Sequence, residues 1–91
     1  MLDEKLDDGG STFWYMKGDF HRENGPAVIG PYGYQAWYQN GKLYRLGGPA
    51  VVWPDGREEW FENGLRHRLD GPAVTWDDGS QEWWENGVKI R

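Results

Sequence analysis

Apolar residues occur along this chain in short runs that turn-forming residues separate at regular intervals. Ala73-Val74-Thr75-Trp76 is β-branched and aromatic, Asp77-Asp78-Gly79 is a turn signal, and residues 81–85 are expected to form the return strand. β-Branched and aromatic residues favour strands, and glycine accepts the positive φ of tight hairpins. Asn86-Gly87 is a strong signal for a second hairpin, after which residues 88–91 are expected to be extended again. No window shows helical periodicity with caps, so the pattern predicts an all-β protein.

The same pattern returns every 23 residues. Three residue types keep this interval in four places each, namely Arg22, Arg45, Arg68 and Arg91; Trp14, Trp37, Trp60 and Trp83; and Gly18, Gly41, Gly64 and Gly87. A fixed period in this range is typical of repeat proteins, in which each unit stacks on its neighbours. The chain is therefore expected to be one repeat domain, residues 1–91. It divides into a degenerate capping repeat at 1–21 and full repeats at 22–44, 45–67 and 68–90, with Arg91 in register for another unit.

Composition narrows the functions to consider. Seven Trp, five Tyr and three Phe supply apolar surface for a thin sheet. The absence of cysteine excludes disulfides and thiolate metal sites. A net charge of −5, with basic residues spread at the repeat interval, argues against binding to nucleic acid or to an anionic membrane. The first eight residues lack the basic and apolar regions of a secretory signal, so we expect a cytoplasmic protein of the producing or infected cell.

The repeat unit, written as Trp-x-x-Asn-Gly with Arg-x-x-Gly-Pro-Ala-Val, resembles the MORN-type repeat. The matching positions include Asn63-Gly64, Asp55-Gly56 and Trp60, and the resemblance covers residues 10–91. The unit is also similar to Trp-x-x-Asn-Gly and Arg-x-x-Gly-Pro-Ala runs in uncharacterised bacteriophage and bacterial proteins. The MORN resemblance implies an elongated, mostly antiparallel single-layer sheet of about three and a half stacked hairpin repeats. It also implies dimerisation and protein or lipid binding, and not catalysis.

The four arginines at the repeat interval, which we call the arginine column, have two interpretations. Guanidinium groups bind carboxylates and phosphates in a bidentate manner, so four arginines in a row could form an array for anions. Alternatively, each arginine pairs with an acid of a neighbouring unit or stacks on its tryptophan. His21 and His67 directly precede two of these arginines.

Carboxylates and histidines are the candidates for catalysis or metal binding. Glu58, Glu59 and Glu62, with Glu82 and Glu85, provide pairs of acids like those of glycosidases. On an open sheet, however, no cleft is expected to raise the pKa of one member of a pair. The two histidines lie two repeats apart, and no serine stands in a Gly-x-Ser-x-Gly elbow. We therefore expect no enzymatic activity, no metal site and no cofactor.

The turn Gly30-Pro31-Tyr32-Gly33-Tyr34 is the one hairpin connection that departs from the repeat pattern. Tyr32 stands where the later repeats have Asp55 and Asp78, and Tyr34 stands where they have Arg57 and Ser80. Two explanations are open, a unique contact with a partner and local repacking against the capping repeat. Aromatic residues dominate the energetics of protein interfaces. The expected partner-binding residues are Tyr32, Tyr34, Trp53, Trp76, Trp84, Glu58, Glu62, Glu82 and Glu85.

The leading functional hypothesis is a non-catalytic protein–protein interaction module. In its specific form, the chain is a small phage-encoded inhibitor that binds a host defence or nuclease-type protein through an acidic, aromatic-rich sheet surface. A second hypothesis is a ligand-binding repeat that stacks a glycan, a quaternary amine or a nucleotide on Trp and Tyr. A third is a structural module that assembles with copies of itself, as a homodimer through an edge strand or a sheet face.

Overall fold

The computed structural model describes residues 4–91 and consists of short strands with one 3₁₀ turn, so the first three residues of the expected cap lie outside the described part. The molecule is elongated, with principal extents of 39 × 26 × 17 Å. The strands are β1 (Glu4–Asp7), β2 (Thr12–Met16), β3 (Asp19–Phe20), β4 (Val28–Ile29), β5 (Gln35–Ala36), β6 (Tyr38–Gln39), β7 (Lys42–Leu43), β8 (Val51–Val52), β9 (Glu58–Glu59), β10 (Phe61–Glu62), β11 (Leu65–Arg66), β12 (Val74–Thr75), β13 (Gln81–Glu82), β14 (Trp84–Glu85) and β15 (Val88–Lys89). The 3₁₀ turn η1 spans Pro31–Gly33.

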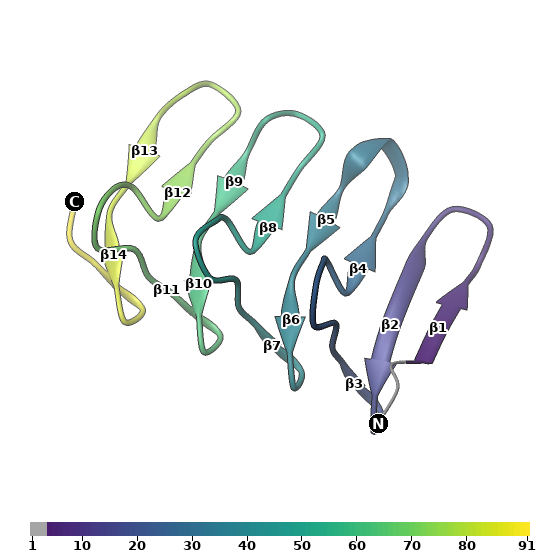
Figure 1. Ribbon diagram of the computed structural model, residues 1–91. Coiled ribbons are helices and arrows are strands. Elements are labelled where there is room, and N and C mark those ends of the chain that lie inside the picture. The colour runs from purple at the N-terminus through teal and green to yellow at the C-terminus, as the bar shows by residue number, and fades with distance from the viewer. Residues whose placement is uncertain (1–3) are drawn as a thin grey trace.

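These strands form one long antiparallel sheet and a row of small hairpins. The main sheet has the order β1-β2-β4-β5-β8-β9-β12-β13, and β3 pairs with β2 beside it. The pairs β6–β7, β10–β11 and β14–β15 are separate two-stranded hairpins along one side of that sheet (Figure 1). The predicted all-β fold of stacked hairpins is thereby confirmed.

In the three full repeats, the return strand is interrupted at the recurring tryptophan, whereas the sequence predicted one continuous strand over 81–85; in the capping repeat, where Trp14 also pairs with Lys5 of β1, β2 continues through it. The structure places β13 before Trp83 and β14 after it. The reason is visible at Trp60, whose N–H donates to the Ala73 carbonyl of the next repeat at 2.7 Å. The Trp60 carbonyl accepts from His67 N–H of its own repeat at 3.1 Å. Since this residue belongs to two different ladders, the chain turns there from the main sheet into the small hairpin.

The Asn-Gly pairs form the tight turns that the sequence predicted. Asn63 has a φ of 53° and Gly64 a φ of 80°, and the Asn-Gly pairs at 40–41 and 86–87 have nearly the same values. Positive φ at both central residues is the signature of a type I′ turn, whose twist matches that of paired strands. Gly64 N–H also donates to the Leu43 carbonyl of the preceding hairpin at 3.0 Å. The same turns thus shape each hairpin and link it to the next.

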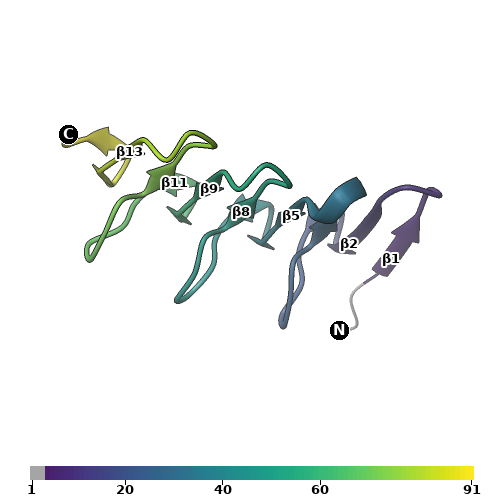
Figure 2. The same ribbon diagram turned by 90° about the horizontal axis from the view of Figure 1, so that it is seen from above.

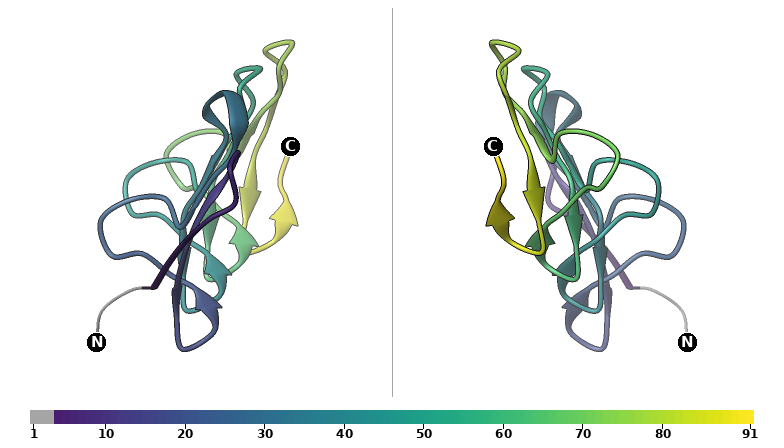
Figure 3. Two further views of the ribbon diagram at one scale, coloured as in Figure 1. Left: turned by 90° about the vertical axis from the view of Figure 1, so that its right-hand side faces the viewer. Right: turned by 90° about the vertical axis from the view of Figure 1, so that its left-hand side faces the viewer.

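The fully buried core is small because the sheet is a single layer. Its members are short side chains, namely Ala27, Ala36, Ala50, Val51, Ala73 and Val74. Viewed from above, the repeats stand in a row, and the loops around 22–26, 45–49 and 68–72 leave the sheet on the same side (Figure 2). The two end-on views show these loops bulging from one face only (Figure 3). Within residues 4–91, no helix has the length and apolarity needed to cross a bilayer.

Candidate interaction surface

Neighbouring side chains on a strand point to opposite sides, so the sheet has two faces, and these two faces present different sets of residues. We call one the Arg–Trp face, after Trp14, Trp37, Trp60 and Trp83 with the arginine column. We call the other the Tyr–Trp face, after Tyr34, Trp53, Trp76 and Trp84 with Glu59 and Glu82.

On the Arg–Trp face, every arginine of the column lies on the tryptophan eight residues earlier. The Arg22, Arg45 and Arg68 guanidinium carbons are 3.8 Å from their ring centroids, and that of Arg91 is 4.3 Å away. In the first three, Nη1 also donates to a carbonyl of its own Gly-Pro element at 3.2 Å, that of Pro26, Pro49 or Pro72. This is the stacked arrangement of the second interpretation.

The glycine before each of these prolines completes the arrangement. A Cβ placed on Gly48 would lie 2.9 Å from Arg45 Cζ, and one on Gly71 would lie 2.7 Å from Arg68 Cζ. The guanidinium is therefore enclosed between an indole ring and a glycine backbone. The Arg-x-x-Gly spacing follows from this contact, because only glycine leaves room for the flat cation.

The two histidines hold the hairpin turns of the following repeats. His21, which is 2% exposed, accepts Asn40 N–H at Nδ1 over 3.0 Å, and His67 accepts Asn86 N–H in the same way. Since Nδ1 accepts, a neutral His21 carries its proton on Nε2, which lies 2.8 Å from Glu23 Oε1. His67 Nε2 lies 3.6 Å from Glu62 Oε2. Each ring nitrogen of His21 thus has a partner within the fold.

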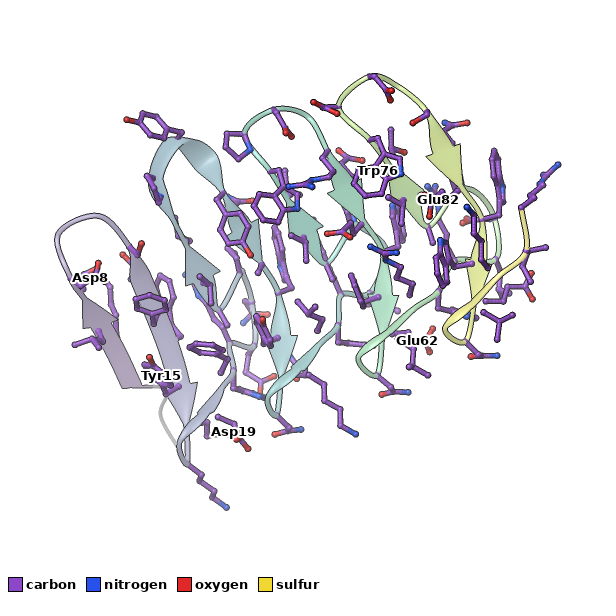
Figure 4. All side chains as sticks on the ribbon, turned by 180° about the vertical axis from the view of Figure 1, so that it is seen from behind. Asp8, Tyr15, Asp19, Glu62, Trp76 and Glu82 are labelled. Atoms are coloured by element: carbon purple, nitrogen blue, oxygen red, sulfur yellow. The ribbon has the colours of Figure 1, made fainter. Side chains whose placement is uncertain are left out.

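On the Tyr–Trp face, carboxylates accept hydrogen bonds from indoles (Figure 4). Glu82 accepts from Trp76 Nε1 at 2.9 Å and from Trp84 Nε1 at 2.8 Å. Glu59 accepts from Trp53 Nε1 at 3.3 Å and from Arg66 Nη2 at 2.8 Å. The expected binding residues Trp76, Glu82 and Trp84 therefore form one internal cluster in the last repeat.

The Glu82 cluster predicts a specific loss of stability in acid. The Trp84 and Trp76 hydrogen bonds lower the pKa of Glu82 below its usual value. A lowered pKa means that this stabilisation is fully present above the ordinary glutamate pKa of about 4.3 and is lost as the pH falls through the lower, folded-state value. We expect Glu82→Gln to lose less stability than wild type over this acidic interval, as measured by urea unfolding at several pH values. A variant with the wild-type pH profile would contradict the assignment.

The turn at residues 30–34, which departs from the repeat pattern, helps to form an apolar surface at the tips of two neighbouring hairpins. We call Pro31, Tyr32, Tyr34, Trp53 and Pro54, which line one shallow pocket, the aromatic tip patch. The rings of Tyr34 and Trp53 meet edge to face, with centroids 4.7 Å apart and planes at 66°. Tyr34 thus packs against the following repeat. Burial, with Tyr38 and Glu59 nearby, raises the pKa of the Tyr34 phenol above its usual value.

Tyr32 is the unusual member of the patch. Its side chain is 92% exposed, and its backbone lies in the left-handed region at φ 60° and ψ 23°. A non-glycine residue in this region costs on the order of 1–3 kcal/mol, and such strain clusters at functional sites. Within residues 4–91, the Tyr32 side chain makes no hydrogen bond and no ring contact with another aromatic residue.

The structure separates the expected partner-binding residues into three groups. Tyr32, Tyr34 and Trp53 lie together in the patch, and Trp76, Glu82 and Trp84 lie together in the last repeat. The remaining acids are exposed and belong to neither group, namely Glu58, Glu62 and Glu85. Sequence reasoning missed Arg57, whose guanidinium lies 4.0 Å from the Trp53 ring centroid and 5.7 Å from that of Trp76. The sequence did contain a signal for Arg57, because this residue stands one repeat after Tyr34, at the equivalent position.

Comparisons with models of known protein families, with curated proteins and with solved structures gave no match. Within residues 4–91, no three histidine, aspartate or glutamate side chains are grouped so that they could hold a metal ion.

Proposed function

We propose that the protein is a non-catalytic binding module that contacts a protein partner through the aromatic tip patch. The observation that supports this most directly is Tyr32, a large aromatic side chain that is almost fully exposed on a strained backbone. Asp55 and Asp78, which are common turn formers, occupy its position in the two later full repeats. A residue that costs stability and makes few contacts within its own fold is explained by contacts to another molecule.

Ligand stacking on the other aromatic residues has less support. The recurring indoles of the Arg–Trp face are already covered by the protein's own guanidinium groups. The indole N–H groups of Trp53, Trp76 and Trp84 are already bonded to Glu59 or Glu82. Among the tryptophans and tyrosines of residues 4–91, Tyr32 is the one that is almost fully exposed to solvent.

The specific form of the proposal is an inhibitor of phage origin that binds a host defence or nuclease-type protein. A net charge of −5 favours a partner with a basic surface. Complementary charge raises the association rate and makes the complex sensitive to salt.

The test compares wild type with Tyr32→Asn in an affinity capture from bacterial lysate, at low and high salt. We expect wild type to retain one stoichiometric protein and the variant to lose it. Because asparagine tolerates the left-handed region, we also expect the variant to gain on the order of 1 kcal/mol in the free energy of unfolding. Loss of the captured protein together with a gain in stability would show that Tyr32 serves binding, because a residue with a structural role would lose stability when replaced.

Leu46→Asn is the matched control, since Leu46 is 86% exposed in a loop outside the patch. It should retain the partner fully. Retention of the same protein by Tyr32→Asn, or the absence of any stoichiometric protein on wild type, would refute the proposal.

A further inference from the structure

The aromatic tip patch lies in a row of acidic turns. The main-sheet strands are joined along one edge by the turns at residues 8–11, 30–34, 53–57 and 76–80 (Figure 1). The second of these is the aromatic turn. The other three contain four exposed aspartates, namely Asp8, Asp55, Asp77 and Asp78. Negative charge therefore flanks the patch on both sides along this edge.

The positive charge available to balance these aspartates is small. Arg57 is the one cation in the four turns, all of which lie within the described residues. Its guanidinium is drawn onto the Trp53 ring, and its Nε is buried without a hydrogen-bond acceptor. No ion pair within 4.0 Å joins Arg57 to any of the four aspartates. The edge is therefore negative around an apolar centre.

Three of the four aspartates, Asp8, Asp55 and Asp78, are fixed in position by hydrogen bonds within their own turns. Asp8 Oδ1 accepts Ser11 N–H at 2.8 Å, and Asp55 Oδ1 accepts Arg57 N–H at 2.9 Å. Asp78 Oδ1 accepts both the N–H and the hydroxyl of Ser80, and these bonds lower the pKa of Asp78 below its usual value. The charges are thus positioned at fixed points beside the patch.

Several backbone groups of the two turns already bond within their own turn, which favours recognition of a partner by side chains. Gly30 N–H donates to the Tyr34 carbonyl at 2.9 Å, and Tyr34 N–H donates to the Pro31 carbonyl at 3.3 Å. In the next turn, Trp53 N–H donates to the Arg57 carbonyl at 2.9 Å. A partner strand that adds to a sheet edge needs free backbone groups. These turns offer aromatic and proline rings instead.

Aromatic surfaces of this kind suit proline-containing segments. A polyproline II segment is already extended before it binds, so it loses little conformational entropy, and its rings pack on aromatic side chains. Arginine or lysine beside the prolines would meet the flanking aspartates and could stack on the exposed Tyr32 ring.

We infer that the aromatic tip patch binds an extended, proline-containing segment that carries arginine or lysine beside its prolines. This inference rests on the proposed function and names the class of partner segment that the patch accepts. The apolar centre selects the prolines, and the acidic turns select the basic residues.

The test titrates the full chain with three synthetic peptides, followed by NMR and by tryptophan fluorescence up to millimolar concentration. One peptide combines prolines with two arginines, the second has glutamates in place of the arginines, and the third has alanines in place of the prolines. We expect the first to bind about tenfold more tightly than either of the others and to weaken as salt is added.

Two variants locate the contact. Tyr32→Asn should abolish binding of the first peptide. Asp55→Asn should weaken it about threefold while leaving stability unchanged, because asparagine preserves the turn and removes only the charge. Equal affinity for the arginine and glutamate peptides, equal affinity for the peptide without prolines, or no binding at all would overturn the inference.

These outcomes are distinct from those of the capture experiment. If no peptide binds but wild type still retains a protein that Tyr32→Asn loses, the inference about the segment fails and the proposed function stands. If Tyr32→Asn retains that protein, the proposed function itself fails.

Discussion

Replacing Trp60 with alanine is expected to lower the free energy of unfolding by about 3 kcal/mol, the usual cost of truncating a packed tryptophan. For a domain of this size, that loss lowers the melting temperature by roughly 12–24 °C. Circular dichroism during thermal and urea unfolding measures both quantities.

The size of this effect follows from the position of Trp60 in the central repeat. Its ring supports the Arg68 guanidinium at 3.8 Å, and its backbone joins two ladders. Because the sheet is one layer thick, no second layer of side chains can move in to fill the space. The loop around Arg68 would lose the surface on which it rests.

Trp60→Phe is the control, since phenylalanine keeps an aromatic face under Arg68 while shortening the ring system. We expect it to cost about a third as much as alanine. An alanine variant within 0.5 kcal/mol of wild type would show that the column contributes little to stability.

Gly48→Ala is expected to cost about 2 kcal/mol, through the loss of the Arg45 cation–π contact and of the bond from Arg45 to Pro49. The added Cβ would lie 2.9 Å from the guanidinium. Trp37 lies on the other side at 3.8 Å, so the cation cannot move away and must leave the stack. The free energy of urea unfolding measures the loss.

A double-mutant cycle gives this prediction its sharpest form. In the Arg45→Ala background, the obstructing side chain is gone, so Gly48→Ala should be nearly neutral. The two changes should therefore be strongly non-additive. Gly10→Ala serves as the neutral control, because a Cβ there meets nothing within 4 Å. Additive costs at Arg45 and Gly48 would contradict the stacked geometry.

The parts of the fold that could be predicted depend on local chemistry. Asn63-Gly64 forms a type I′ turn because its residues accept positive φ, and this property needs no neighbour. The interruption of the return strand at Trp83 could not be predicted in the same way. At the equivalent Trp60, the interruption arises because the N–H donates to a partner in the next repeat, the Ala73 carbonyl at 2.7 Å.

The candidate site was predictable only in part. Tyr32 and Tyr34 differ visibly from their repeat equivalents, so the sequence indicated the turn. The sequence could not show that Tyr34 packs on Trp53 while Tyr32 stays exposed, because exposure depends on how neighbouring hairpins meet. The sequence placed Trp76 and Trp84 beside the two tyrosines as expected partner-binding residues, yet in the structure their indole N–H groups are bonded to Glu82.

By itself, the sequence determined the all-β class, the 23-residue period and the position of the turns, since all three depend on backbone preferences and spacing within one repeat. Only the tertiary structure decided between an open arginine array and a stacked column. That choice depends on the space between a ring and a glycine backbone, here Trp37 and Gly48 around Arg45, which exists only when the chain has folded across them.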